Sequence, residues 1–458
     1  MSGVISGFSR RTAAAVALVC LHWGAWGGDF SRAYQAALQN DAQYTAARYA
    51  LESGRQAWPI ARAAILPTVT ASISETVVQG TRDIEDATGT TSTNLDYRAP
   101  SQSVTARMPL YNPVGLAGTD VAAVQVAAAE SQFEVRRTEL LERVTTAFLQ
   151  RMLAEDVFNA LHVQLQAAVE QRNLMRKRME RGEGTKTEVA EARASVSTIM
   201  AQWADARDQV TSTRAALAAM TGETALMGTE AAVRLADDFK PPALEPSEVQ
   251  QWVSMALESS PALRTKRQIV QMAMANVRRV DAGHLPRLDL VANVANSRNE
   301  TTSSLNQTVN QRSLGLQLSI PIYSGGQVVA LAKQAIAEQT RAEAEVLNEQ
   351  RAIELDVTRL FKVVQNGTAK LESYVDALEA SNIAAEGVRL GQASGLRTNA
   401  DVLEALRKAA QAQRDLAQAR YDHVLQRIRL FNRSGMPAEK IVEQVDALLR
   451  RDAATSTQ

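Results

Sequence analysis

The sequence predicts a mainly helical protein with a membrane β-sheet, built from two copies of one structural unit. Three observations predict this class: landmark residues recur at a constant shift, two very long segments lack proline, and four segments alternate apolar with polar residues. The 458 residues carry 50 basic and 50 acidic side chains, and this neutral total argues against nucleic-acid binding, which requires a basic surface. The mean hydropathy of −0.19 argues against a bundle of membrane helices.

The N-terminus has the pattern of an export signal. Arg10 and Arg11 precede the apolar run Thr12–Leu21, and small residues follow at a suitable cleavage site. The run is too short to span a bilayer, which leaves a buried N-terminal helix as the alternative. The only cysteine, Cys20, lies inside this run, so the mature chain would contain no disulfide. We therefore expect residues 1–27 to be a signal peptide.

The chain after the signal contains two halves with the same landmarks in the same order. Phe148 recurs as Phe361, and the pattern Gly182-x-x-Thr185-x-x-Glu188 recurs as Gly395-x-x-Thr398-x-x-Asp401 at the same shift. Agreement at one shift over this length indicates an internal duplication. The predicted divisions are a first repeat over 28–222, a proline-containing linker over 223–247, a second repeat over 248–435 and a C-terminal segment over 436–458.

Each repeat is expected to contain a helical segment, two strands, a very long helix, a glycine-containing turn and a shorter helix. Leu-Pro ends the first helical segment of each repeat. In the second long helix, apolar residues recur every seven positions, as in a coiled coil. In chain order, the expected helices are Ser31–Ile65, Val114–Arg181, Thr187–Met220, Glu248–Gly283, Gln327–Gln392, Asn399–Asn432 and Ala438–Leu449.

The four expected strands lie around Val69–Val77, Val104–Met108, Leu288–Val294 and Leu314–Ile320, where apolar residues alternate with small or polar ones. About ten alternating residues suffice for a tilted strand to cross a bilayer. Four strands cannot close a barrel, and an open edge in lipid leaves backbone groups unpaired. If the sheet lies in a membrane, the chain must therefore oligomerise, and three chains would supply twelve strands. A half-buried sheet in a soluble protein is the alternative.

These features together resemble the TolC family of outer-membrane channel-tunnels. The resemblance covers essentially the whole mature chain and rests on the duplication, the Leu-Pro before each strand pair, Pro321–Gly326, Gly395–Ala405 and the pairs Tyr421-Asp422 and Ser434-Gly435. It implies a homotrimer with a 12-stranded β-barrel, four strands per chain, in the outer membrane. The barrel would continue into a long α-helical coiled-coil barrel in the periplasm.

The resemblance also implies a function and partners. Members are exit ducts of tripartite export machines, and the details are most similar to type I protein secretion. The expected partners are a periplasmic adaptor (membrane fusion protein), an inner-membrane ABC transporter, an exported protein such as an RTX-type toxin, and outer-membrane lipid. Small-molecule efflux is the alternative duct, and a soluble periplasmic coiled-coil adaptor or scaffold is the alternative of another class.

The helix that follows the second turn carries the most informative charges. Asp401 and Glu404 are three residues apart and share one helix face, so a three-fold axis would stack them into two rings of carboxylates. The resemblance implies that these acids line a closed periplasmic entrance and that Arg397 helps to lock it, with Thr187 and Glu188 as partners. The family's best-studied member has a tyrosine where Gln392 stands, which puts one hydrogen bond of the lock in doubt.

The same residues have a simpler interpretation. Thr398 with Asp401, and Thr185 with Glu188, match helix-capping boxes, and acids in a first turn are favoured by the helix dipole. Gly182 and Gly395 then serve only as turn residues. Glu404 would pair with a basic residue one turn along the helix, as surface charges commonly do. Capping and gating are compatible roles.

The sequence offers no catalytic, cofactor or metal constellation, so we expect neither an enzyme nor a cofactor. The four histidines, His22, His162, His284 and His423, are scattered and lack the spacing of metal ligands. The turn over 182–187 lacks the glycine that a phosphate-binding loop places directly before its lysine. An enzyme built on a helical shell therefore has no supporting residues.

Overall fold

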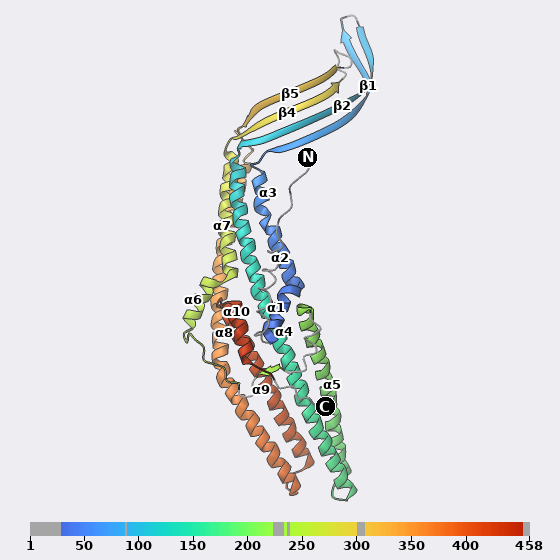
Figure 1. Ribbon diagram of the computed structural model, residues 1–458, viewed down its shortest axis with the longest axis vertical. Coiled ribbons are helices and arrows are strands. Elements are labelled where there is room, and N and C mark those ends of the chain that lie inside the picture. The colour runs from blue at the N-terminus through green and yellow to red at the C-terminus, as the bar shows by residue number, and fades with distance from the viewer. Residues whose placement is uncertain (1–28, 88, 223–232, 236–238, 300–306, 452–458) are drawn as a thin grey trace, which may run out of the picture. The chain divides into compact units, whose positions relative to one another are not determined.

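The computed structural model describes residues 29–87, 89–222, 233–235, 239–299 and 307–451 (Figure 1). The predicted signal peptide and most of the predicted linker lie outside these residues. The chain forms two compact units. The first comprises the described parts of Met1–Arg48, Glu134–Ser260 and Gln350–Gln458, and the second comprises those of Tyr49–Phe133 and Pro261–Glu349. Each unit therefore draws on both predicted repeats.

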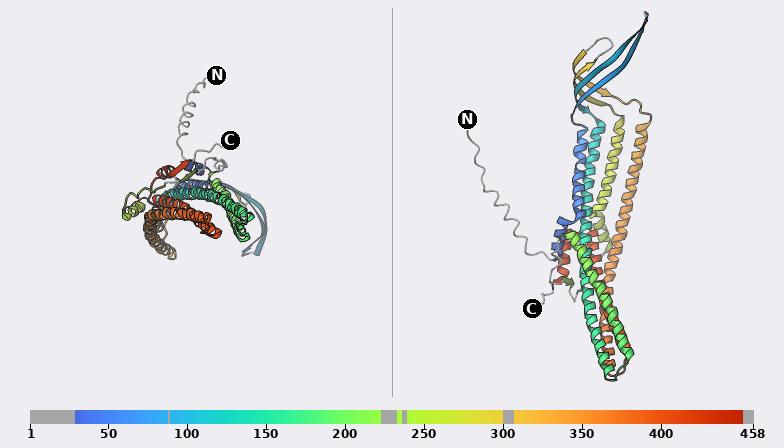
Figure 2. Two further views of the ribbon diagram at one scale, coloured as in Figure 1. Left: turned by 90° about the horizontal axis from the view of Figure 1, so that it is seen from below. Right: turned by 90° about the vertical axis from the view of Figure 1, so that its right-hand side faces the viewer.

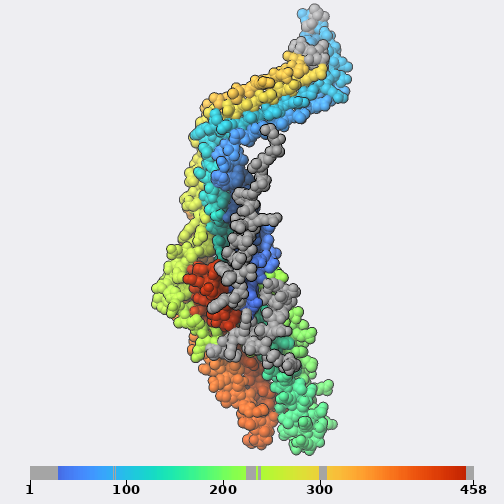
Figure 3. All heavy atoms as spheres, in the orientation of Figure 1, coloured from blue at the N-terminus to red at the C-terminus, as the bar shows by residue number. Residues whose placement is uncertain are grey.

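The second unit contains a four-stranded antiparallel sheet at the places where alternation predicts strands. Its spatial order is β1-β2-β4-β5, so β1 and β5 are the edges. In Figure 3 the atoms of β4 and β5 (yellow to orange) form one continuous surface with those of β1 and β2 (blue to cyan). The strands are β1 (Thr68–Asp86), β2 (Gly89–Tyr111), β4 (Arg287–Asn299) and β5 (Gln307–Ser319).

One face of this sheet is apolar. Cross-strand pairs align Val69 with Ala106, Ala106 with Ala292, and Ala292 with Leu314 across all four strands. Because side chains alternate along a strand, neighbours two residues away share this face. The register adds Ala71, Ile73, Val104, Met108, Leu290, Val294, Leu316 and Leu318 to the same face.

The opposite face of the sheet is polar. Thr105 Oγ1 donates a hydrogen bond to Asn293 Oδ1 at 3.1 Å across β2 and β4. The apolar face, by contrast, lies open in the single chain, since Ile73 is 82% and Leu314 is 74% exposed. Large contiguous apolar surfaces of this kind mark contacts with lipid or with other protein.

Strands β1 and β2 are longer than predicted, at 19 and 23 residues. β2 pairs with β4 only from Ser101 onward, and its earlier residues pair with β1 alone as a two-stranded ribbon, seen in Figures 1 and 2. Thr90–Asn94 is polar at every position. This hides the period-two pattern from which strands are predicted.

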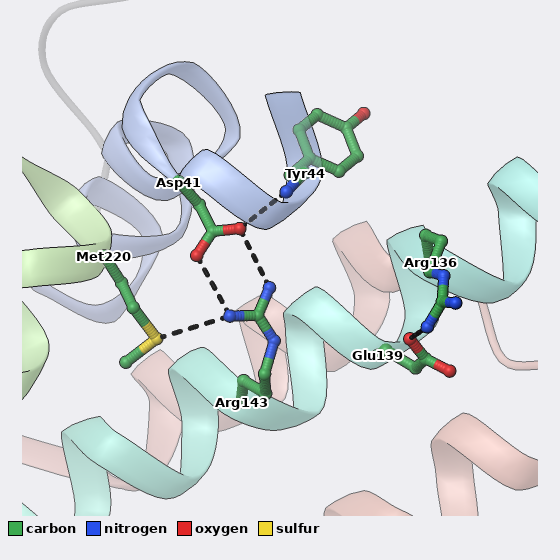
Figure 4. A network of polar contacts seen from close by, with 6 residues as sticks. All are labelled: Asp41, Tyr44, Arg136, Glu139, Arg143 and Met220. Atoms are coloured by element: carbon green, nitrogen blue, oxygen red, sulfur yellow. Dashed lines mark hydrogen bonds and ion pairs between the residues drawn. The ribbon is translucent and has the colours of Figure 1, made fainter. Parts of the chain in front are cut away.

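The predicted single helix Ser31–Ile65 is wrong, because the structure divides it into three. Its parts are α1 (Asp29–Asn40), α2 (Ala42–Arg55) and α3 (Ala57–Ala63). Asp41, at the first break, accepts a hydrogen bond from the Tyr44 amide at 2.7 Å and two from Arg143 at 2.9 and 3.0 Å (Figure 4). Burial alone would raise the pKa of Asp41, but these hydrogen bonds outweigh it and hold the pKa below its ordinary value.

The predicted helix Glu248–Gly283 is likewise divided. It consists of α6 (Val249–Ser259), α7 (Pro261–Asp281) and the 3-10 turn η2 (Ala282–His284). Ser260 has ψ 117°, outside the helical region, because the ring of the following Pro261 disfavours a helical conformation there.

Two helical hairpins make up much of the first unit (Figures 1 and 2). The helices are α4 (Pro113–Glu180), α5 (Lys186–Thr221), α8 (Gln327–Ala393) and α9 (Asn399–Arg433), and α4 and α8 also contribute residues to the second unit. Three residues of the predicted heptad seam of α8, Val357, Val364 and Leu371, are at most 6% exposed, and the fourth, Leu378, is half-buried. The repeated pair Phe148 and Phe361 is buried in one apolar core with Val357 and Val364.

A small two-stranded sheet, which was not predicted from the sequence, joins a segment of the predicted linker to the C-terminal segment. β3 (Val233–Leu235) lies within the predicted linker and pairs with β6 (Leu449–Arg451), directly after α10 (Ala438–Leu448). Strands of three residues are too short to show periodicity. Leu235 nevertheless reaches the main core of the first unit.

Across the described parts of the chain, no helix is both long and apolar enough to cross a membrane.

Candidate functional site

The candidate site lies at the two turns that close the hairpins α4/α5 and α8/α9, both in the first unit. Gly182 has φ +77° and Gly395 has φ +78°. This left-handed conformation is disfavoured for residues with a Cβ atom, so glycine is required at both turns. The two glycines occupy equivalent positions of the duplicated sequence, and both adopt the same left-handed backbone conformation.

Both helices that leave these turns begin with a capping box. In α5, Thr185 Oγ1 accepts from the Glu188 amide at 3.2 Å, and Glu188 Oε2 accepts from the Thr185 amide at 2.7 Å. In α9, Thr398 and Asp401 exchange the same bonds at 3.2 and 2.9 Å. The turns and helix starts are therefore fixed by short-range interactions, as expected for rigid tips.

On the first turns of α9, Asp401 is half-buried and Glu404 is exposed. Hydrogen bonds from Thr398 lower the pKa of Asp401, with a smaller contribution from the positive charge of Arg397. A hydrogen bond from Arg407 lowers the pKa of Glu404, and Arg407 and Lys408 lie 2.8 and 3.8 Å from its Oε1 atom. Both side chains are therefore carboxylates at neutral pH, although Glu404 is partly neutralised by its neighbours.

Arg397 lies on the turn with its stem against α8, where a Cβ atom on Gly391 would meet Arg397 Cγ at 2.8 Å. Between described residues, no hydrogen bond or ion pair joins Arg397 to Thr187 or Glu188. Glu188 instead closes its own capping box, and Thr187 lies exposed one residue before it. The structure of the single chain thus does not bring Arg397 together with the two residues expected to be its partners.

Three buried amide side chains join the hairpins at this level, and we call them the amide cluster: Gln171 on α4, Gln392 on α8 and Asn399 on α9. Gln171 Nε2 lies 3.0 Å from both Gln392 Oε1 and Asn399 Oδ1. Asn399 Nδ2 reaches the Glu188 backbone oxygen at 3.4 Å. The three side chains are 8%, 5% and 1% exposed, so water does not compete freely for these bonds.

Sequence reasoning singled out Gln392 only for lacking a tyrosine hydroxyl, and it missed Gln171 and Asn399. Gln171 is one glutamine among several on a very long helix, with no local pattern that marks it. Asn399 directly follows a capping threonine and has the composition of an ordinary helix start. The amide cluster is formed by contacts between residues far apart in the sequence, and a local sequence pattern does not reveal such contacts.

Nothing in the described part of the chain suggests metal or acid–base chemistry. No group of three or more His, Cys, Asp or Glu side chains within it is placed to hold a metal ion. His162 contacts Gln166 on its own helix, and His423 is buried. Burial, and then the nearby charge of Arg427, lower the pKa of His423 to about 4, so this ring is neutral at neutral pH.

Comparisons with known proteins place the chain among outer-membrane channels. It is 30% identical to the proteases secretion protein PrtF of Dickeya chrysanthemi, over 85% of this chain and 84% of PrtF. It is 28% identical to the alkaline protease secretion protein AprF of Pseudomonas aeruginosa, over 92% and 89%. It is also 25% identical to the outer membrane protein TolC of Vibrio cholerae, over 95% and 97%.

Solved structures give the same fold. The Campylobacter jejuni CmeC outer membrane channel matches with a TM-score of 0.73 over 92% of this chain and 90% of that one, at 14% identity. The open state of the Neisseria gonorrhoeae MtrE outer membrane channel matches with a TM-score of 0.69 over 89% and 88%, at 18% identity. The model of the family described as outer membrane efflux protein matches residues 33–223 and 252–435. The chain belongs to the outer membrane efflux protein family, and its fold is that of the TolC-like channels.

Proposed function

We propose that this protein is the outer-membrane exit duct of a type I secretion system and passively conducts an exported protein out of the cell. The observation that carries the proposal is the sheet with one open apolar face, one polar face and two unpaired edges. In lipid, such a sheet is stable only when its edges are closed and its apolar face meets the bilayer. The polar face would then line an aqueous passage.

Closure requires other copies of the chain. Three copies would pair each β1 edge with a neighbour's β5 edge and give a barrel of twelve strands, an even number typical of outer-membrane barrels. The exposed apolar face supports an outer-membrane location for this barrel. The helical hairpins would extend into the periplasm, where the proposed partners are an adaptor and an inner-membrane ABC transporter.

The cargo class is inferred from the relatives. PrtF and AprF are named for the secretion of proteases, and they match this chain over most of its length. A folded-protein or polypeptide cargo is therefore favoured over a small molecule. The RTX-type toxin expected from the sequence belongs to the same cargo class.

Asp401 and Glu404 are proposed to form the entrance. In a trimer these acids of three α9 helices would face one axis as two rings of carboxylates, which attract cations and repel anions. Arg397 lies next to Asp401 and is proposed to help hold the closed state together with Thr187 and Glu188. In the single chain these residues are not in contact, so any such lock would have to form in the trimer.

Complementation tests the proposed cargo. The chain is expressed in cells that carry the PrtF-associated exporter and its protease but lack PrtF, and protease activity is measured in the medium and in the cells. We expect secretion to be restored, with PrtF itself as the positive control. Retention of all protease inside cells whose outer membrane contains the chain would contradict the secretion assignment.

Small-molecule efflux is the second candidate, because the chain is 28% identical to the outer membrane efflux protein BepC of Brucella suis over 70% of each protein. The same strain background can test it. Cells lacking their own efflux channel would regain resistance to detergents and dyes if the chain works with a drug pump. Restored resistance without restored protease secretion would favour efflux over protein export.

A further inference from the structure

The polar face of the four-stranded sheet is uncharged over most of its length. The hydrogen bond between Thr105 and Asn293 lies on this face, and side chains two residues away along each strand share it. Three successive cross-strand rows then contain only hydroxyl, amide, small or apolar side chains. These rows are Thr70, Thr105, Asn293 and Ser313; Ser72, Ser103, Ala295 and Gln311; and Ser74, Ser101, Ser297 and Val309.

Outside the β1/β2 ribbon, the described strands carry charges on this face only at one end of the sheet. This is the end that adjoins α3, α4 and α7 (Figure 1), and we call it the helix end. Arg107 on β2 pairs with Val291 on β4 in the first row beyond the uncharged ones. Asp289 and Arg287 on β4 occupy the next two rows toward the helices.

The exposed charge at the helix end is positive. Arg287 Nε lies 3.0 Å from Asp289 Oδ2, but the Asp289 side chain is only 7% exposed, against 43% for that of Arg287. Arg107 is exposed and forms no ion pair with a described residue. The polar face therefore presents guanidinium groups to water here, with the one carboxylate beneath them.

A groove beside Arg287 adds another guanidinium group. Its volume is about 520 Å³, and its lining includes Arg279 of α7, Arg287 of β4 and Ser319 of β5. Arg279 Nε and Nη2 donate hydrogen bonds to Asn276 Oδ1 at 3.1 and 2.8 Å, which hold its side chain in place. None of the described residues that line the groove is acidic. Its charge therefore favours an anionic ligand.

We propose that Arg107, Arg279 and Arg287, which we call the arginine collar, form an anion site that binds acidic segments of the exported polypeptide. This inference rests on the proposed function, because it names the part of the cargo that the duct engages. Three copies of the chain would bring nine of these guanidinium groups together, three per chain, against three Asp289 carboxylates. Guanidinium groups bind carboxylates through paired, charge-assisted hydrogen bonds.

The collar has the opposite charge to Asp401 and Glu404. Those acids belong to the first unit, whereas all three collar residues belong to the second. Conduction requires binding that is favourable enough to attract a ligand and weak enough to release it. A single positive zone that adjoins uncharged hydroxyl and amide rows meets this requirement for an acidic segment, because the rows beyond the collar do not retain it by charge.

Block of the ion current by poly-L-glutamate tests the collar in the purified full-length channel. The polymer is added to each chamber of a planar bilayer in turn, and the concentration that halves the current is measured. Arg107→Gln removes an exposed side chain that no described residue pairs with, so the fold should be preserved. The block should weaken about tenfold, as expected for the loss of a hydrogen bond to a charged group.

A second variant tests the collar at Arg287. Arg287→Gln is combined with Asp289→Asn, because replacing Arg287 alone would leave a buried carboxylate unpaired. This variant keeps the net charge of the chain and should still weaken the block. Arg312→Gln is the matched control, since Arg312 pairs with Val294 on the apolar face of the same sheet. Equal block in the parent and both collar variants, or an equal loss in the control, would overturn the collar.

The sign of the site is tested with poly-L-lysine and with reversal potentials. Block by poly-L-lysine should not weaken in Arg107→Gln, and cation preference should increase. This is the reverse of the change expected when Asp401 and Glu404 are replaced. Equal weakening of the block by both polymers would mean that the variant changes the passage itself, and it would contradict an anion site.

Protease secretion distinguishes this inference from the proposed function. In the complementation strain, Arg107→Gln should slow the appearance of protease in the medium relative to Arg312→Gln, at equal amounts of channel in the outer membrane. A weaker block with unchanged secretion would contradict binding of the cargo at the collar. Collar-dependent block in a parent channel that restores no secretion would instead leave the anion site standing and contradict the proposed function.

Discussion

Asp401 and Glu404 are held ionised by different neighbours, which matters for the charge they present. The Asp401 carboxylate accepts a hydrogen bond from the Thr398 amide, whereas the Glu404 carboxylate forms ion pairs with Arg407 and Lys408. Both side chains remain accessible to water in the single chain, where surface contacts of this kind contribute little to stability. Their importance therefore depends on the proposed three-fold arrangement.

Replacing both acids by alanine should change conduction. Asp401→Ala with Glu404→Ala removes six negative charges from the entrance of a trimer, so single-channel conductance in planar bilayers should rise and cation preference should weaken. Glu386→Ala is the matched control, since Glu386 pairs with Arg389 as Glu404 pairs with Arg407. Unchanged conductance and selectivity in the double variant, or equal changes in the control, would contradict the gate assignment.

The pH dependence of cation preference follows from the same contacts. Hydrogen bonds lower the pKa of Asp401 from 3.8 and that of Glu404 from 4.5, so both stay charged down to these values. Because the charged form is the favoured one, its effects are present above the ordinary pKa and are lost as pH falls through the lowered pKa. Reversal potentials should keep their cation preference at pH 5 and lose it only as the pH falls below the ordinary pKa values of the two groups. A midpoint above 4.5 would instead show that repulsion between the ring carboxylates dominates.

At the scale of elements, the two turns explain why the hairpins end where they do. Gly395 has a left-handed backbone, whereas Gly387, two turns earlier in α8, has helical geometry with open space where a Cβ atom would lie. The same substitution should therefore have opposite effects at these two positions.

Gly395→Ala should destabilise the channel by about 1–2 kcal/mol, because a residue with a Cβ atom is strained in the left-handed region. Gly387→Ala should stabilise it by up to about 1 kcal/mol, since alanine is the better helix former. Thermal unfolding followed by circular dichroism measures both. Equal destabilisation by the two variants would mean that the turn conformation at Gly395 is not the cause.

The helices and strands were largely predictable because their signals are local and periodic. The very long helices α4 and α8 have no internal proline, and their predicted ends lie within one residue of the observed ones. The helix breaks at Asp41 and Ser260 were not predicted. The break at Asp41 is stabilised by a distant arginine, and the break at Ser260 is caused by the adjacent proline. The second of these was readable in principle from the Ser-Pro pair.

The candidate site was predictable only in part. Caps and turn glycines follow from short sequence patterns, and the structure contains both capping boxes. The amide cluster depends on Gln171 meeting residues more than two hundred positions away, which no local pattern encodes. The roles of Arg397, Thr187 and Glu188 in a lock remain predictions, since they concern contacts between chains.

At the scale of the whole molecule, the account depends on closure of the sheet by other copies of the chain. Four strands with a bare apolar face and two free edges are unstable alone in lipid, whatever the cargo. Secretion, efflux and the carboxylate rings all require this closed assembly.

The most direct test is therefore the mass of the native assembly extracted with mild detergent from isolated outer membranes, measured by native mass spectrometry. The account predicts protein in the outer-membrane fraction with three times the mass of one mature chain. A monomer or dimer, or recovery of the protein only from the soluble periplasmic fraction, would contradict it.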